Sequence, residues 1–275
     1  MKKLMRSFVY LFLGGASLIS IYPFLWMIVS MTNKSVDVTQ GRLLPGTHLF
    51  ENIKVLFETV DIATALLNST IIAVITTILT LLISSLAGYG FEIYRSKGKD
   101  WVFNILLVSL MIPFAAIMIP LYRFFGGIAH TMPAIGIDTL SAVILPTMTT
   151  AFFVFLFRQN TKMFPRDLIE AGRIDGLSEL GIFFRIYMPT MKTTYAAAAI
   201  IAFMNSWNNY LWPLVILQSP EKQTIPLLIS NLGAGYAPDY GVIMTAIVIA
   251  TLPTAIVFFL MQKHFVAGMT GSVKG

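Results

Sequence analysis

Cysteine is absent from the 275-residue chain, and histidine occurs only three times. Without thiols there can be no disulfide framework, cysteine nucleophile or cysteine metal site. His48, His130 and His264 are scattered along the sequence and do not indicate a metal cluster. Also missing are the G-x-x-x-x-G-K-[ST] phosphate loop, the G-x-S-x-G elbow and the H-E-x-x-H helix. We therefore expect no catalytic residue, no metal site and no cofactor on this chain.

Charge is also scarce. Charged residues make up 12% of the sequence and hydrophobic residues 56%, whereas soluble domains usually carry about 25% charge. The mean hydropathy of +0.77 agrees with this imbalance, which indicates an integral membrane protein surrounded by lipid. The net charge of +6 does not indicate a nucleic-acid partner, because the basic residues flank apolar runs and form no patch with stacking aromatics.

Long apolar runs are what the sequence has in quantity. A helix needs about 20 apolar residues to cross the hydrocarbon core. Six stretches supply them: 8–31, 65–91, 101–125, 139–157, 193–217 and 240–261. We expect an all-α, polytopic membrane protein with six transmembrane helices in one domain, residues 1–275. Prolines within these runs predict kinks, which neighbouring helices can accommodate.

Basic residues predict the orientation of these spans. With the N-terminus inside, only five of the nineteen Lys and Arg residues fall in outer segments: Lys34, Arg42, Lys54, Arg123 and Lys222. Cytoplasmic loops are normally the ones rich in Lys and Arg. Six spans return the chain to the side on which it starts, so both termini are expected in the cytoplasm. The loop at 161–190 is expected there too.

The loop at 161–190 has the pattern of two short helices joined at a glycine. Pro165 suits the first turn of one helix, and Gly176 suits the left-handed position that ends it. Ser178 is a candidate N-cap for a second helix that Pro189 closes. Apolar residues of that second helix recur at helical spacing: Leu180, Phe183, Phe184 and Tyr187. From this pattern alone, an ordinary amphipathic hairpin on a membrane surface is the other interpretation.

This loop resembles the EAA loop of membrane subunits of ATP-binding-cassette (ABC) importers, in which Glu-Ala-Ala, a later Gly and a final Ile-x-Leu-Pro recur. Gly172 stands where that family usually has Ala, and Met188 where it usually has Leu. The resemblance implies a cytoplasmic coupling helix for the ATPase, with these residues in it: Glu170, Ala171, Gly172, Asp175, Gly176, Ile186 and Pro189.

Amides and aromatics in the fifth expected span form the other informative stretch. Asn205, Asn208, Asn209 and Trp212 recur at i, i+3, i+4 and i+7, which predicts one face of a helix. Amides and an indole suit neutral, hydroxyl-rich sugars, because they offer hydrogen bonds in both directions and a flat apolar surface. The alternative is an interfacial aromatic belt with asparagines that hold helices together. We place these residues on the candidate substrate path.

Taken over nearly its whole length, the chain is similar to the MalG-type permease subunit of carbohydrate importers. The similarity includes the Ser-Trp-Asn-Asn-Tyr-Leu-Trp-Pro run and the tail at 265–275. It implies the type I ABC importer permease fold in a bacterial cytoplasmic membrane. The implied partners are a second homologous permease, two cytoplasmic ATP-binding subunits and an extracytoplasmic sugar-binding protein. ATP would then be bound and hydrolysed on a partner chain, and the tail would reach the ATPase pair.

Two other functions remain open at this stage. A self-contained secondary carrier or channel for a small polar solute is disfavoured because ionisable residues are almost absent from the expected spans, and coupled carriers usually keep such residues on their pathway. A membrane-bound scaffold or receptor subunit without transport is the third candidate.

Overall fold

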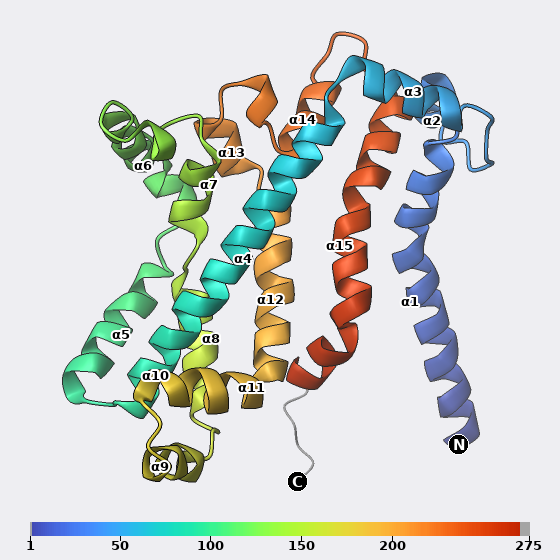
Figure 1. Cartoon of the computed structure of the whole chain (residues 1–275). Helices are drawn as coiled ribbons and strands as arrows, with labels where there is room; N and C mark the ends of the chain where they lie inside the picture. Colours follow the sequence, from blue (N-terminus) through green and yellow to red (C-terminus); the bar gives the residue numbers. More distant parts are fainter. Residues whose placement is uncertain (1, 270–275) are drawn as a thin grey trace. The chain divides into compact units, whose positions relative to one another are not determined.

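The structure, a computed structural model, describes the backbone of residues 2–269 and the side chains of residues 5–262. Every regular element in this described part is a helix, as Figure 1 shows. In chain order the elements are α1 (Lys2–Ser30), α2 (Ser35–Thr39), α3 (Leu49–Thr59), α4 (Ile62–Ile93), α5 (Lys97–Ser109), α6 (Phe114–Ile128), η1 (Pro133–Ile135), α7 (Leu140–Thr147), α8 (Ala151–Thr161), α9 (Arg166–Ile174), α10 (Glu179–Ile182), η2 (Phe183–Tyr187), α11 (Met188–Thr190), α12 (Lys192–Trp207), α13 (Leu211–Ile216), η3 (Pro220–Lys222), α14 (Ile225–Gly233) and α15 (Tyr240–Met269). The all-α expectation is confirmed. The tail beyond residue 269, with its expected ATPase contact, lies outside the described residues.

Three continuous helices are long and apolar enough to cross a membrane: Met5–Ser30 within α1, α4, and Tyr240–Gln262 within α15. Two more spans are possible as bent pairs, α5 with α6 at 98° and α7 with α8 at 43°. The fifth expected span contains α12, which has 16 residues and ends at Trp207. Within the described residues, length and composition therefore support three to five of the six expected spans.

Prolines stand at the breaks in the third and fourth expected spans. Pro113 is the residue before α6 and has an extended backbone, because proline lacks the N–H that would continue α5 and disfavours a helical conformation in the residue before it. The kink expected from the prolines of 101–125 is present, as a break at which α5 and α6 meet at 98°. In the fourth span Pro146 lies in α7, and the chain leaves the helix shortly after it.

The structure divides into two compact units. Unit 1 comprises Met1–Ala65 and Ile225–Leu252, and unit 2 comprises Leu66–Thr224 and Pro253–Gly275. In unit 1 the buried amide of Asn52 donates to the carbonyl oxygens of Met31 and Asn33, each at 2.9 Å. Asp239 begins α15 by accepting from the backbone N–H of Gly241 at 2.9 Å. Polar side chains thus fix the segments between the helices of this unit.

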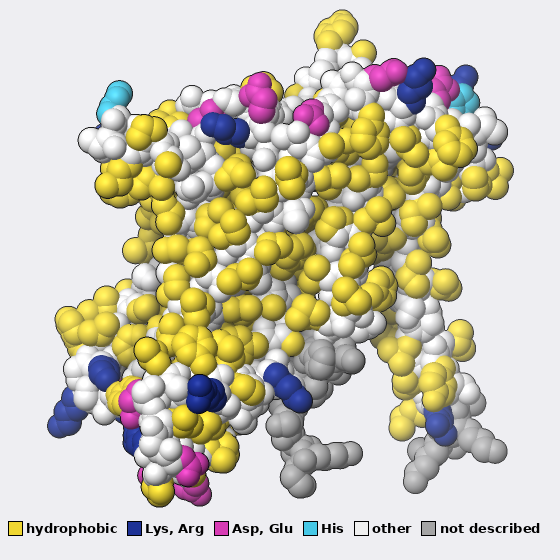
Figure 2. Space-filling view, viewed as in Figure 1, with side chains coloured by type: hydrophobic (Ala, Val, Ile, Leu, Met, Phe, Trp, Pro, Cys, Tyr) yellow, Lys and Arg dark blue, Asp and Glu magenta, His cyan; other side chains and the backbone are white. Residues whose placement is uncertain are grey.

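Unit 2 contains the candidate sites and has a core centred on Trp212. This side chain is fully buried, and its indole N–H donates to the carbonyl oxygen of Ala142 at 2.9 Å. The rings of Phe114 and Phe125 pack on it, with centroids 5.9 and 6.1 Å away. In this unit charged side chains gather at the two opposite ends, with an apolar surface between them (Figure 2), as expected of helices that cross a bilayer.

Asp138 fixes the loop at one charged end of unit 2. Its backbone φ is 60°, an uncommon value for a residue other than glycine. The carboxylate accepts from the N–H groups of Gln218 and Ser219, at 2.9 and 3.0 Å. Lys222 forms an ion pair with it at 3.5 Å. These contacts hold η3 against the start of α7.

Candidate coupling loop and substrate path

The first helix of the loop, α9, ends in a Schellman motif. The N–H of Leu177 donates to the carbonyl oxygen of Gly172 at 3.0 Å, and the N–H of Gly176 donates to that of Arg173 at 3.1 Å. Gly176 has a φ of 77°, which glycine adopts without the steric cost that other residues meet. The predicted glycine elbow is confirmed. Pro165 lies directly before α9 as its N-cap residue, one position earlier than expected.

The second helix begins as predicted but does not continue as a regular α-helix. The hydroxyl of Ser178 accepts from the N–H of Gly181 at 3.2 Å and caps α10. The chain then forms a π turn over Phe183–Tyr187, in which the N–H of Met188 donates to the carbonyl oxygen of Phe183. A π turn holds an extra residue and shifts the faces that follow it. The predicted apolar stripe is therefore only half right: Phe183 and Tyr187 are buried, whereas Leu180 and Phe184 are exposed.

The residues assigned to coupling do not share one environment. Glu170 and Ala171 are exposed on α9, and Glu170 has no ion-pair partner among the described residues. Asp175 is the exposed C-cap of α9. Pro189 does not close the second helix, because it lies within α11 and α12 begins three residues later. Pro189 lacks the N–H that a regular helix would use, and it lies two residues after the end of the π turn. Prolines and π turns are both common where a helix is irregular.

Gly172 permits close packing between the two helices of the loop. It is buried, and a Cβ on it would lie 2.7 Å from the Cδ1 atom of Ile186 and 3.1 Å from the Cγ1 atom of Ile182. Ile186 is half-buried in this contact. Glycine at this position costs about 1 kcal/mol of helix propensity if exposed, but here it also brings α9 closer to its neighbour. The two helices of the loop thus form one packed body.

An aromatic cluster attaches this body to α4. Tyr89 on α4 lies 4.8 Å from Tyr187 and 5.4 Å from Phe183, measured between ring centroids. Phe164, just before α9, lies 5.3 Å from Tyr187. The hydroxyl of Thr161 donates to the carbonyl oxygen of Phe157 and is 2.6 Å from the Tyr187 hydroxyl. Since Thr161 has one proton, Tyr187 is the donor in that second bond.

Helices α4 and α8 approach closely at Gly88. A Cβ there would lie 2.7 Å from both the backbone nitrogen of Arg158 and the Cβ of Phe157. Only glycine allows this approach without displacing the backbone of α8. Glu92 follows one helical turn later on the same face of α4, so the contact at Gly88 brings the Arg158 side chain to Glu92.

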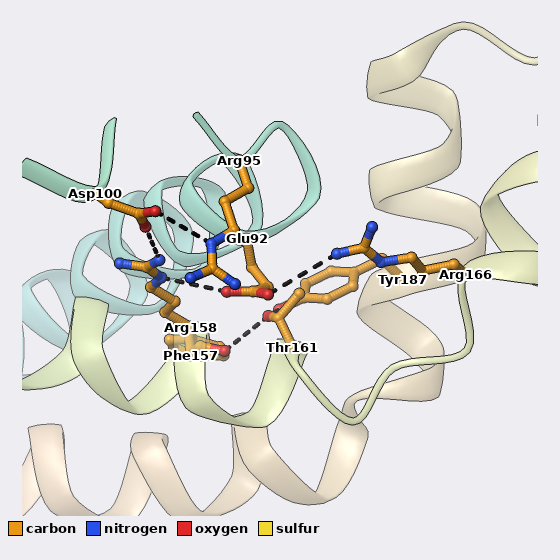
Figure 3. Close-up of polar contacts among 8 residues, drawn as sticks. All are labelled: Glu92, Arg95, Asp100, Phe157, Arg158, Thr161, Arg166 and Tyr187. Carbon is orange, nitrogen blue, oxygen red and sulfur yellow. Dashed lines mark hydrogen bonds and ion pairs between the residues drawn. The ribbon is translucent and has the colours of Figure 1, made fainter. Parts of the chain in front are cut away.

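Glu92 and Arg158 form the centre of a buried ion cluster, drawn in Figure 3. Their side chains are each 6% exposed, and the Nε of Arg158 is 3.3 Å from a carboxylate oxygen of Glu92. Arg158 also pairs with Asp100 at the start of α5, and its guanidinium lies 4.1 Å from the Phe103 ring centroid. Such a buried arginine is stabilised only because several partners replace the water that it loses.

The same cluster reaches the loop at 161–190. Arg166, the first residue of α9, lies 3.9 Å from the second carboxylate oxygen of Glu92 (Figure 3). The ion cluster thus joins α4, α5, α8 and α9. Sequence reasoning missed it, because Glu92 and Arg158 are 66 residues apart and stand directly after apolar runs. The available signal was a charged residue at the end of each run, of which only Arg158 entered the prediction of orientation.

A second polar contact lies on the exposed side of the loop. Glu179 accepts hydrogen bonds from the Nε of Arg173 at 2.8 Å and from the Tyr94 hydroxyl. The Arg173 bond, and then the Tyr94 bond, lower the pKa of Glu179 below its usual value. Arg173 and Glu179 are 45% and 49% exposed, and such surface pairs contribute little to stability. The bond between Arg173 and Glu179 connects the two sides of the glycine elbow.

Replacement of Gly176 by proline should disrupt the elbow. Proline fixes φ near −65° and removes the N–H that donates to Arg173, so both halves of the Schellman motif are lost. If the loop has the coupling role that its resemblance to the EAA loop implies, the Gly176→Pro chain should insert, but ATP-driven uptake should fall at least about tenfold, as a coupling change of roughly 1.4 kcal/mol produces. Rates of uptake by cells with matched amounts of membrane-inserted chain measure this.

Gly176→Asn is the matched control. No atom lies within 4 Å of a Cβ built at this position, and asparagine tolerates the left-handed conformation better than other residues. We expect most of the uptake to remain. Equal losses in both variants would show that the elbow's conformation is not what matters.

The residues assigned to the substrate path do not form one helical face. Helix α12 ends at Trp207, Asn208 is its C-cap, and Asn209 lies in the break before α13. The Asn208 amide donates back to the carbonyl oxygen of Met204. The predicted face over 205–212 is therefore wrong, because it assumed an unbroken helix, and Trp212 is buried in the core. Asn205 and Asn209 do line a common cavity, so their role on the path stays a prediction.

Several known proteins are similar to this chain over most of its length. A family model described as "Binding-protein-dependent transport system inner membrane component" matches residues 81–271. The lactose transport system permease protein LacG of Rhizobium radiobacter is 49% identical over 96% of this chain and 95% of its own length. The arabinooligosaccharides transport system permease protein AraQ of Bacillus subtilis (strain 168) is 37% identical over 98% of this chain and 96% of its own. A solved structure of a bacterial ABC transporter involved in the import of the acidic polysaccharide alginate matches with a TM-score of 0.82 and 21% identity, over 96% of this chain and 97% of that chain.

Proposed function

Because the chain belongs to the family of binding-protein-dependent transport system inner membrane components, we propose that it is the permease subunit of an ABC importer for sugars or oligosaccharides. It is a multi-pass inner membrane protein with the type I ABC importer permease fold. Its relatives named above are permeases for lactose and for arabinooligosaccharides. A neutral saccharide is therefore the proposed substrate class.

The exposed surface of α9 is the observation that best supports coupling to an ATPase. Glu170 has no ion-pair partner in the described part of the chain. Large apolar side chains surround this segment and are exposed, among them Ile174 at 86%, Leu180 at 64% and Phe184 at 46%. A patch of exposed apolar side chains with a charged group beside it is typical of a protein interface. We propose that an ATP-binding subunit docks on this surface.

The anchoring of the loop suggests how a push from that subunit would reach the spans. The aromatic cluster around Tyr187 joins the loop to α4, and the ion cluster around Glu92 joins it to α4, α5 and α8. A packed body attached at two places moves as a unit, because tightly packed interiors transmit displacement. Closure of the ATPase pair would therefore shift the ends of these helices and change access to the path.

The proposed assembly has this chain as half of the translocation path and a second homologous permease as the other half. Two cytoplasmic ATP-binding subunits bind and hydrolyse ATP, and an extracytoplasmic sugar-binding protein delivers the substrate. This chain would then bind no cofactor and perform no catalysis. Both of its termini and the loop at 161–190 lie in the cytoplasm in this proposal. The ion cluster gives no support to a secondary carrier, because Glu92 and Arg158 neutralise each other.

Uptake by the reconstituted transporter tests this function. The complete complex in proteoliposomes should import at least one neutral sugar from a panel of labelled mono- and oligosaccharides. Import should require ATP on the side of the ATP-binding subunits, because this chain has no phosphate-binding loop of its own. It should also require the binding protein, because that protein delivers the sugar in this proposal. Omission of each partner in turn is the control. Import that follows an ion gradient and continues without ATP would instead identify a secondary carrier.

A further inference from the structure

Two helix breaks meet at one cavity inside unit 2. The break between α7 and α8 contributes Thr147 and Thr150, and the break after α12 contributes Asn209. Irregular backbone at membrane depth is tolerated only where it is buried in protein or lines a water-filled space. Thr80 on α4 satisfies part of the first break, because its hydroxyl donates to the carbonyl oxygen of Met148 at 2.8 Å. Thr149 in the same break lies 3.4 Å from the Ser84 hydroxyl, measured between the two side-chain oxygens, and the cavity wall takes Thr147, Thr150 and Asn209 from the two breaks.

The cavity has the size of a single sugar ring. Its volume is about 250 Å³, somewhat below the roughly 300–1,000 Å³ of pockets for drug-sized ligands. It exceeds the share of one water molecule in the liquid, about 30 Å³, by roughly eightfold. A monosaccharide unit fits a space of this size, whereas a whole oligosaccharide does not.

The lining residues suit a neutral polyol. Phe114 and Phe152 supply aromatic surface, while Asn205 and Asn209 supply amides that both donate and accept hydrogen bonds. None of the residues that line the cavity in the described structure is charged. A carboxylate or phosphate bound here would lose its hydration without a compensating partner, which is costly. The chemistry therefore favours a neutral ring over an acidic one.

One buried hydroxyl of the cavity wall lacks a hydrogen-bond partner in the described part of the chain. Thr76 on α4 is 3% exposed, and its Oγ1 makes no hydrogen bond. A buried hydroxyl without a partner is destabilising, so its presence in the wall of this largely apolar cavity points to a ligand that completes it. Asn205 at the same cavity is exposed. An amide there would be costly against lipid, which favours a mouth that faces a wet path.

We propose that this cavity is a transit site for one neutral sugar ring, with Thr76, Asn205 and Asn209 as its hydrogen-bonding residues. The site rests on the proposed function and adds to it a location on this chain and the residues that would bind the neutral sugar. The sugar would occupy the site after leaving the binding protein and before reaching the cytoplasm. The two aromatic rings would contact the apolar faces of the sugar.

The first test compares Thr76→Val with Thr77→Val in the complete reconstituted transporter. Thr77 is the neighbouring buried threonine on α4; its hydroxyl is also unpartnered, but it does not line the cavity. The apparent KM for the sugar reflects the affinity of the binding protein and not that of the cavity. Loss of the hydrogen bond from Thr76 should therefore appear as fewer sugar molecules imported per ATP hydrolysed. We expect a decrease of about 2- to 10-fold for Thr76→Val, the range conferred by one hydrogen bond, and no change for Thr77→Val.

A labelling experiment keeps the test decisive if Thr76→Val assembles poorly. The chain has no cysteine, so Ser206→Cys places a single thiol on it in the cavity wall, and Thr131→Cys places one in an exposed loop as a control. The transported neutral sugar should slow modification of residue 206 by a water-soluble maleimide, and should not slow it at residue 131. A phosphorylated sugar of equal size should protect neither.

The outcomes separate the site from the function. Wild-type complex that imports no sugar of the panel overturns the proposed function, and the site with it. The site alone is overturned by a different set of results. In that case the wild-type complex imports sugar, both threonine variants have the same ratio of sugar imported to ATP hydrolysed, and sugar does not change the rate of modification at residue 206. Labelling that accelerates only on removal of lipid would show an acyl chain in the cavity instead. Equal protection by the phosphorylated sugar would overturn the neutral preference.

Discussion

Arg158→Met should destabilise the chain by about 3–5 kcal/mol, the cost of breaking a buried ion pair by removing one partner. The substitution leaves Glu92 buried at 6% exposure, and Arg166 at 3.9 Å is then its one ion-pair partner within the described part of the chain. Asp100 is 31% exposed and can regain water. The loss of stability therefore comes mainly from the buried, poorly balanced charge of Glu92. Because the cluster holds the loop, we also expect little transporter to assemble at 37 °C.

Two variants distinguish charge burial from lost packing. Glu92→Met/Arg158→Met removes both charges and should recover most of the stability, because apolar replacements of a buried pair are often neutral. Arg95→Met removes a 58% exposed arginine that contacts the same Asp100 at 3.1 Å, and should cost at most about 1 kcal/mol. The fraction of folded chain after heating in detergent ranks the three. Arg158→Met as stable as Arg95→Met would show that the buried pair does not contribute as argued.

Glu170→Arg should separate the ATPase from a permease that is still folded. Folding provides little reason for this carboxylate, because an exposed acid on a short helix gains only about 0.3–1 kcal/mol from the helix dipole. At an interface, a charge-assisted hydrogen bond to an arginine contributes about 1.5–3 kcal/mol, and reversal of the charge adds repulsion. We expect ATPase affinity to fall by at least about 10- to 100-fold. The amount of ATPase that co-purifies measures this.

Glu58→Arg is a matched charge reversal for this experiment. Glu58 is 65% exposed on α3 and pairs with Lys54 at 3.8 Å. We place this segment on the extracytoplasmic side of the membrane, away from the ATPase. Its reversal should leave ATPase co-purification unchanged. If Glu58→Arg and Glu170→Arg release the ATPase equally, the effect is one of net charge and α9 is not the docking surface.

The parts of the loop that sequence reasoning predicted are those fixed by near neighbours. Gly176 and Ser178 form their structures through bonds that reach at most five residues along the chain. The π turn was not predicted, because the spacing of Leu180 and Phe184 fits an α-helix just as well. Tertiary contacts decide the matter: burial of Tyr187 against Tyr89 selects the face that turns inward.

Long-range features were the ones that sequence reasoning did not find. The ion cluster depends on the approach of α4 and α8 at Gly88, which no local pattern announces. In the fifth span, the spacing of Asn205 and Asn209 indicated one helical face, but the chain leaves the helix at Asn208. That break moves Trp212 into the core while Asn209 stays at the cavity. The sequence thus indicated which residue types carry the polar chemistry of this span, but not how the chain arranges them in space.

The most direct test of the central claim is the simultaneous measurement of ATP hydrolysis and sugar uptake by proteoliposomes that contain wild-type or Glu170→Arg permease. The wild-type complex should couple the two, with hydrolysis stimulated by the loaded binding protein. In the Glu170→Arg complex uptake should vanish, and the stimulation should vanish with it, while the permease remains inserted. Wild-type rates of both activities in the Glu170→Arg complex would contradict the docking of an ATPase on α9.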